Sequence, residues 1–235
     1  MKQSHTLRMT LVLLALSGLT TICSAQSGTA SSKQTAAIAT VSVAACNVPN
    51  SVTPCPGTWV DLVPALTVKT SNSTSLFVDV STVVGLYTST QVKGNNTGAT
   101  SSATATAGVH VRVLLDHVVY AFPDALGSGI DFDNRVQTLT ANLGNIFTSA
   151  CAASSTTCIL TAEQITLILN TSSAHAFNFV LLNVGSGTHT VDVQVLADTK
   201  TDNTGGTGGV AIAGAAYGPA SVTIDVVRLV HDFSF

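Results

Sequence analysis

Apolar and polar residues alternate with a period of two through much of the chain, and no other feature restricts its fold as strongly. In 109–113 valines alternate with a histidine and an arginine, in 191–195 they alternate with aspartate and glutamine, and 222–226 repeats the pattern. Successive side chains of a β-strand point to opposite faces, so each run predicts a strand with one buried and one solvated face. Strands of this kind belong to antiparallel sheets.

Segments with this β signature follow one another along the chain, separated by turns rich in Gly, Asn, Ser and Pro. Many strands without long helices between them favour an all-β fold, here an antiparallel β-sandwich of jelly-roll type. We interpret the low-complexity stretches 94–107 and 202–209 as long hairpin connections. We expect strands at 37–44, 58–62, 66–70, 75–82, 85–92, 108–115, 118–122, 135–142, 176–183, 189–199, 210–216 and 220–230.

One segment departs from the alternation and predicts a short helix near 162–169. Thr161 is a good N-cap, and Gln164 falls three residues later, which completes a capping box. Leu160 and Ile165 stand where a hydrophobic staple would join them. The alternative is a strand, because the sequence Ile-Thr-Leu-Ile-Leu that begins at Ile165 also has high β-propensity.

The first residues have the pattern of a cleavable signal peptide. Lys2 and Arg8 are basic, 9–19 is apolar, and Cys23-Ser24-Ala25 fits the small-x-small cleavage site. We therefore expect a secreted protein, extracellular or at the cell surface, with the periplasm as an alternative. The expected organisation is a signal peptide at 1–25, a flexible leader at 26–36 and a single β-sandwich domain at 37–235.

Charge and composition narrow the range of partners. Charged residues make up 9% of the chain, and its formal net charge is −3. Loss of the two basic residues of the signal peptide leaves seven basic residues against twelve acidic ones, a net charge of −5. Proteins that bind nucleic acid carry a basic patch or stripe, which this sequence lacks, so we expect no nucleic-acid partner.

Four cysteines remain after export, and they fall in two close pairs. Cys46 and Cys55 are near each other, and so are Cys151 and Cys158. Four cysteines allow 3 pairings, and an oxidising compartment permits disulfides. The spacings favour the local disulfides Cys46–Cys55 and Cys151–Cys158 over a zinc site, which needs closer spacing.

Candidate catalytic and metal-binding residues are few. The sequence has no G-x-S-x-G elbow, and Glu163 is its single glutamate, so we expect no enzyme activity and no cofactor. Asp124, Asp131 and Asp133 form the one acidic group that could bind calcium, although calcium requires more oxygen ligands than these three supply.

Aromatic residues give the alternative of a carbohydrate-binding module. Trp59, Tyr87 and Tyr120 are the candidate platform on which sugar rings would stack. A concave face that gathers all three would favour this function. The partner would then be an extracellular glycan instead of an extracellular protein.

The strand pattern carries a resemblance to a known group of proteins. The runs that begin at Leu66, Ser75, Gly108, Phe177 and Gly187 together resemble secreted prokaryotic β-sandwich proteins of jelly-roll type that lack an assigned function. The resemblance covers about 60–230 and rests on strands and turns. It implies a fold and an extracellular setting, and it carries no functional residue across.

The leading hypothesis is a secreted, non-catalytic β-sandwich that serves as a surface or matrix component or as a protein-interaction module. A second alternative is a strand-exchanged filament subunit. Thr35–Ala45 is β-prone and uncharged, so it could pair within its own sandwich or with an exposed edge strand of a neighbour, giving a homo-oligomer.

Overall fold

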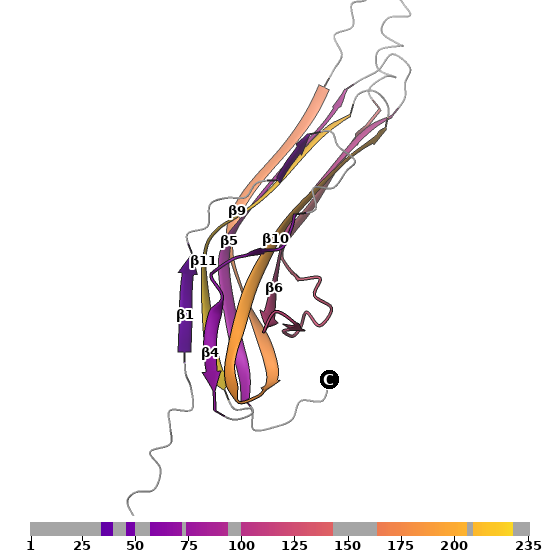
Figure 1. Cartoon of the computed structure of the whole chain (residues 1–235). Helices are drawn as coiled ribbons and strands as arrows, with labels where there is room; N and C mark the ends of the chain where they lie inside the picture. Colours follow the sequence, from indigo (N-terminus) through magenta and orange to yellow (C-terminus); the bar gives the residue numbers. More distant parts are fainter. Residues whose placement is uncertain are drawn as a thin grey trace, which may run out of the picture.

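The computed structural model of the chain contains two antiparallel β-sheets that pack face to face (Figure 1). It describes residues 34–39, 46–49, 57–71, 74–93, 100–142, 164–205 and 209–227, with backbone alone for 34–39, 46–49 and 204–205. The strands are β1 (Gln34–Ala39), β2 (Cys46–Pro49), β3 (Val60–Asp61), β4 (Leu66–Thr70), β5 (Thr74–Lys93), β6 (Ser101–Leu115), β7 (Val119–Tyr120), β8 (Ile130–Ala141), β9 (Gln164–Val184), β10 (Gly187–Gly205) and β11 (Val210–Val227).

The pairing scheme confirms the predicted jelly roll. Sheet A has the order β1-β11-β5-β9, with β2 also on β11, and sheet B has the order β3-β10-β6-β7, with β4 on β10 and β8 on β6. The pairs are nested along the chain: β1 pairs with β11, β4 with β10, β5 with β9 and β6 with β8. A long antiparallel hairpin rolled into two sheets has this connectivity, which defines a jelly roll.

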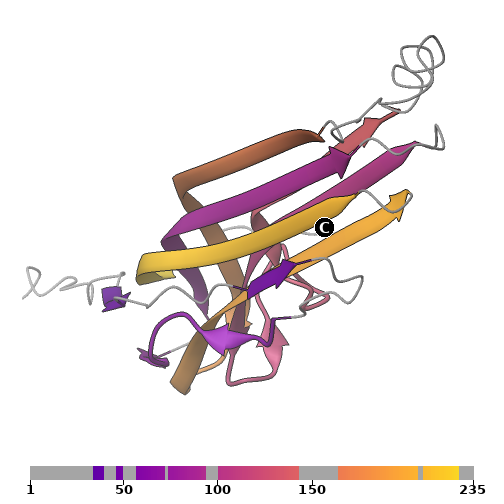
Figure 2. The same ribbon diagram turned by 90° about the horizontal axis from the view of Figure 1, so that it is seen from above.

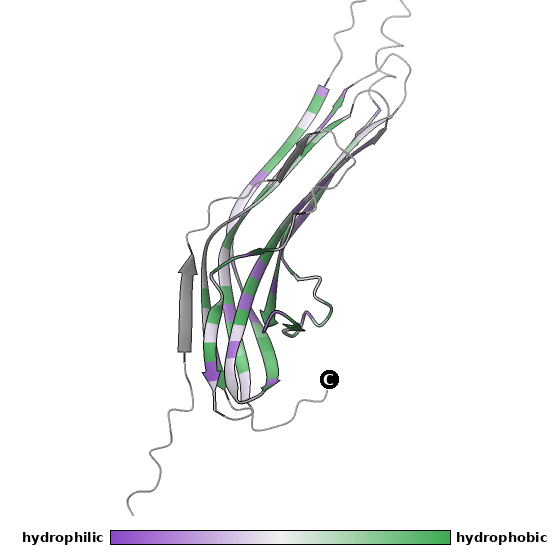
Figure 3. Ribbon diagram, viewed as in Figure 1, coloured by the Kyte–Doolittle hydropathy of each residue, from purple (hydrophilic) through white to green (hydrophobic). Residues whose placement is uncertain are grey.

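Side chains between the sheets form a large and a small hydrophobic core. The large core holds valines, leucines and Phe179, including Val78 and Val80 of β5 and Val111 of β6. The small core, toward the Lys93 end of β5, is made of alanines and one valine. Hydrophobic and hydrophilic residues alternate along the strands in Figure 3, as the sequence pattern predicts.

A buried amide links the sheets between these two cores. Thr88 donates to Oε1 of Gln137 at 2.7 Å, and Nε2 of Gln137 donates to Oγ1 of Thr90 and to the carbonyl of Leu167, each at 2.7 Å. Thr88 and Thr90 come from sheet A and Gln137 from sheet B. Because buried polar groups are costly unless they are paired, this amide fixes how the two sheets are aligned.

The predicted helix is wrong over 164–169. These residues begin β9, and they pair antiparallel with β5 from Gln164 opposite Lys93 onward. The described residues contain no helix, and 162–163 lie outside them. The capping signals are local, whereas the ladder with β5 satisfies every second backbone group of this isoleucine- and threonine-rich segment, so tertiary pairing prevails.

Several strands are longer than the sequence predicts. The expected strands 75–82 and 85–92 are one strand, β5, and 210–216 joins 220–227 in β11 across a register shift between Tyr217 and Ala220. Parts of the expected loops are strand as well, since Ser101–Ala107 belongs to β6 and Asp202–Gly205 to β10.

The N-terminal strand begins inside the expected leader. β1 starts at Gln34 and pairs with β11 of the same chain, from Gln34 opposite Asp225 to Ala39 opposite Ala220. Within Thr35–Ala45, therefore, 35–39 form an intramolecular strand, and 40–45 lie outside the described residues. Among the described residues, no helix is long and apolar enough to cross a membrane.

Replacement of Gln137 tests the inter-sheet amide. Gln137→Ala removes the partner of two buried threonine hydroxyls and should lower the free energy of unfolding by about 2–3 kcal/mol. The exposed Asn134, also on β8, is the control, and Asn134→Ala should change stability by less than about 0.5 kcal/mol. Urea unfolding followed by circular dichroism measures both. Equal effects of the two substitutions would contradict this role.

Candidate functional site

Every histidine among the described residues has an aspartate partner. Side-chain nitrogen and carboxylate oxygen lie between 2.5 and 3.7 Å apart in these pairs. The pairs are His110 with Asp131 and Asp198, His117 with Asp192, His175 with Asp133, and His189 with Asp116.

His110 on β6 is held by a carboxylate on each ring nitrogen. Its Nδ1 lies 2.5 Å from Asp131 on β8, and its Nε2 lies 3.0 Å from Asp198 on β10. A neutral imidazole has one N–H donor, so donation to both carboxylates requires the imidazolium. The hydrogen bond to Asp198 is the main reason that the pKa of His110 is raised, and the charge of Asp131 adds to it. The charged ring thereby ties three strands of sheet B together.

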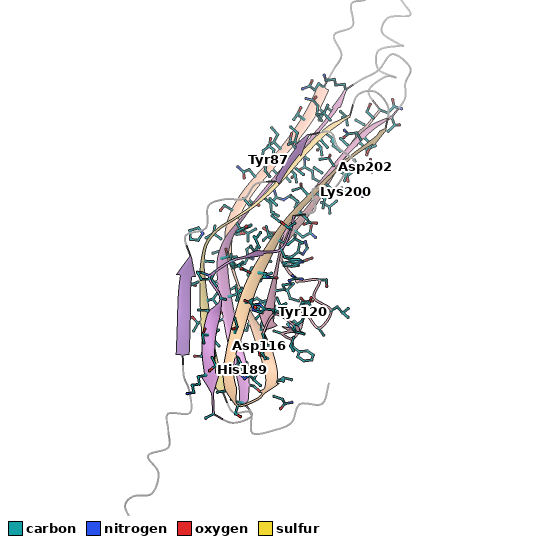
Figure 4. All side chains as sticks on the ribbon, in the orientation of Figure 1. Tyr87, Asp116, Tyr120, His189, Lys200 and Asp202 are labelled. Atoms are coloured by element: carbon teal, nitrogen blue, oxygen red, sulfur yellow. The ribbon has the colours of Figure 1, made fainter. Side chains whose placement is uncertain are left out.

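A second pair joins two turns of sheet B, beyond the Leu115 end of β6. Asp116 and His117 are the two central residues of the β-turn that follows β6, in which the Val118 amide donates to the Leu115 carbonyl, and both have left-handed φ angles, 51° and 65°. Asp116 accepts from the Thr190 amide and lies 2.8 Å from Nδ1 of His189, whose Nε2 lies 3.1 Å from the carbonyl of Gly185. This contact raises the pKa of His189 and lowers that of Asp116. Figure 4 shows His189 and Asp116 side by side.

The candidate calcium ligands have three separate partners. The register between β6 and β8 shifts at Phe132, so Asp131 lies opposite His110 while Asp133 lies opposite Val109, on the other face. Asp133 approaches His175, and buried Asp124 accepts the amide of Gly129 at 2.9 Å. No group of three or more His, Cys, Asp or Glu side chains in the described part of the chain is arranged to hold a metal ion.

Ser173, His175 and Asp133 only superficially resemble a catalytic triad. Oγ of Ser173 lies 2.6 Å from Nε2 of His175, and the carboxylate of Asp133 lies 3.7 Å from the same nitrogen. In a Ser-His-Asp triad the aspartate binds the other ring nitrogen and orients it. This arrangement therefore lacks the geometry that activates a serine nucleophile.

The structure brings two of the three candidate sugar-binding aromatics together. The guanidinium carbon of Arg112 lies 4.2 Å from the ring centroid of Trp59 and 5.6 Å from that of Tyr120. Arg112 also donates from Nε to Gln194 at 2.9 Å. Tyr87 is on sheet A, far from Tyr120 in Figure 4. Because Arg112 lies over the indole, a sugar would have to displace a cation–π contact to stack on that face.

Two glycines allow the rings of Tyr120 and Trp59 to pack closely against the backbone. Gly127 and Gly129 have φ of 73° and 84°. A Cβ at Gly127 would lie 2.3 Å from the Tyr120 ring, and one at Gly129 would lie 2.5 Å from Trp59. The Gly-Ser-Gly sequence at 127–129 is the feature of the sequence that indicates such close packing.

The predicted disulfides remain predictions. Cys46 is the first residue of β2, opposite Ala215 of β11, and the structure describes its backbone alone. Cys55, Cys151 and Cys158 lie outside the described residues.

The two edges of sheet A differ in whether further strands cover them. In Figure 2, β9 lies at one edge of the sheet, with β5 and then β11 beside it. The β11 side is covered by β1 and β2. Beyond β5, the one backbone partner of β9 within the described residues is Phe122, which exchanges two hydrogen bonds with Val180. From Gln164 to Asn178, β9 is therefore a free edge strand in the described chain.

The free part of β9 lacks the features that normally protect an edge strand. Its first eleven residues, Gln164–Ala174, include no charged side chain and no proline. Four large apolar side chains are exposed there, between 41% and 56%: Ile165, Leu167, Ile168 and Leu169. Natural edge strands usually carry lysine, proline or a bulge that blocks pairing with another chain. Sequence reasoning missed this surface because it assigned its residues to a helix.

Comparison with known proteins does not assign a family. No family model matches the chain, and no curated protein matches it. Matching solved structures include that of the infectious bursal disease virus Gx strain, at 8% identity, 81% coverage of this chain and a TM-score of 0.16. The T13 particle of the same virus matches at 13% identity, 81% coverage and a TM-score of 0.15. The chain spans 42% and 41% of those chains, and TM-scores this low do not establish a shared fold.

The contacts of His110 with Asp131 and Asp198, here called the His110 clamp, predict how stability depends on pH. A histidine whose pKa is raised by folding contributes stability that is complete below its unfolded value, 6.5, and is lost as the pH rises through the folded value. The unfolding free energy should therefore fall as the pH rises from 6.5 through the raised pKa of His110. His110→Gln should make this slope shallower, although His189 retains a contribution of the same sign.

Urea titrations at a series of pH values measure that slope. Asn134→Ala, which removes no titrating group, should keep the wild-type slope. A His110→Gln variant with the same slope as the wild type would show that the clamp makes no contribution.

Proposed function

We propose that the protein is a secreted, non-catalytic β-sandwich that acts as a surface or matrix component and binds other proteins by strand addition to β9. The observation that carries this proposal is the free, uncharged edge over Gln164–Ala174, with its four exposed apolar side chains. Strand addition supplies backbone hydrogen bonds to an edge and uses the side chains on alternate positions for specificity.

The polar side chains favour binding over catalysis. The histidines and aspartates of sheet B contact one another in pairs that link neighbouring strands and turns, and they do not converge on one reacting atom. The contact between Ser173 and His175 lacks an aspartate on the second ring nitrogen. These pairs connect neighbouring strands and turns of the sandwich.

The carbohydrate-binding alternative has weaker support. Trp59 and Tyr120 are both engaged with Arg112, and Tyr87 belongs to the other sheet. The three rings therefore do not form one platform. An open edge strand is the better candidate for a contact with a large partner.

A lysine on the free edge tests the proposal. Ile168 is 56% exposed, so Ile168→Lys should leave the fold intact while placing a charge that opposes strand addition. In the organism that produces the protein, we expect the variant to shift from the cell-associated or matrix fraction into the medium. Quantitative immunoblotting of the two fractions measures this shift.

Leu126→Lys is the matched control, because Leu126 is a 91% exposed leucine in the loop before β8. It adds the same charge and should be retained like the wild type. Circular dichroism checks that both variants fold. Equal retention of Ile168→Lys and the wild type would refute binding through β9.

A further inference from the structure

We propose that the partner on the β9 edge is a second copy of this chain, paired antiparallel about a two-fold axis at Leu167. This inference rests on the proposed function, because it names the partner of the same edge. In such a dimer, sheet A of one copy continues into sheet A of the other.

The backbone of β9 presents the required groups. Val180 directs both its N–H and its C=O away from β5, where Phe122 pairs with them. The register between β5 and β9 is continuous from Leu181 to Gln164. Backbone groups alternate in direction along an antiparallel strand, so Thr166 and Ile168 also direct their N–H and C=O off the edge. With the axis at Leu167, Thr166 of one copy pairs with Ile168 of the other.

The side chains select this register. Ile165, Leu167 and Leu169 share one face, because they lie opposite the inward-facing Val92, Thr90 and Thr88 of β5. An axis at Leu167 places Leu167 opposite its own copy and Ile165 opposite Leu169. An axis at Ile168 would place Ile165 opposite Thr171, and one at Leu169 would place it opposite Ser173. The Leu167 axis alone among these three matches all the exposed apolar side chains on that face.

Charge favours self-pairing at this place over others. The whole chain has a net charge of −3, so two copies repel one another in general. The segment Gln164–Ala174 carries no charge, and antiparallel pairing of it with itself brings no like charges together. A two-fold contact needs a surface that complements itself, and a symmetric uncharged edge strand meets that condition.

Cysteine cross-linking of the full-length protein tests both the partner and the register. Directly opposed residues in an antiparallel pair have Cα atoms about 4.5–5.5 Å apart, within the range that a disulfide spans. Leu167→Cys should therefore form a disulfide-linked dimer under mild oxidation. Leu169→Cys is the matched control, with 42% exposure against 41% for Leu167. In the proposed register its two copies are offset by four residues, about 13 Å, so it should not cross-link.

Non-reducing gels and mass spectrometry identify the linked residues, and sedimentation velocity on the unmodified protein measures the dimer directly. We expect a concentration-dependent dimer that Ile168→Lys abolishes. Preferential cross-linking through Leu169→Cys would overturn the register. A wild-type protein that stays monomeric and a Leu167→Cys variant that does not cross-link would overturn self-pairing. The proposed function would survive that result if Ile168→Lys still released the protein into the medium, and it would fall if retention were unchanged.

Discussion

The backbone ladder centred on β5 is the interaction on which the rest of the structure depends. β5 pairs along nearly its whole length with β11 on one side and with β9 on the other. These two ladders place the inward-facing valines and leucines of sheet A opposite those of β6 and β10, and so they create the large core. They also make β9 the edge of sheet A, because no further strand of the described chain pairs with β9 beyond the contact at Val180.

The two ends of the sandwich are stabilised in different ways. One end relies on bulky aliphatic side chains, whose burial contributes roughly 1.5–3 kcal/mol each. The other is lined by alanines and threonines, which bury less apolar surface. There the Gln137 amide supplies directional bonds that small apolar side chains cannot provide. The exposed part of β9 belongs to this second end, where the core offers its side chains the least cover.

Period-two alternation was enough to predict the sandwich, because it depends only on which face of a strand is buried. It fails where the inward residues are small. At 101–107 alanine and threonine alternate with little hydrophobic contrast, so the pattern predicts a loop where the structure has a strand. The segment 164–169 carried genuine helix-capping signals, and only the distant β5 decides against them. The His110 clamp was also beyond the sequence, because a one-residue register shift at Phe132 determines which aspartate reaches the ring.

The nested pairing of the strands affects the order in which the sheets can fold during synthesis. Of the strands that the structure describes, β1 is synthesised first and its partner β11 last. Contacts between such distant segments form slowly, because a long loop must close before they gain any stability. A nascent chain of this design cannot complete sheet A while β11 is missing. For a protein that we propose is exported, this order leaves sheet A incomplete for as long as the chain is still being synthesised.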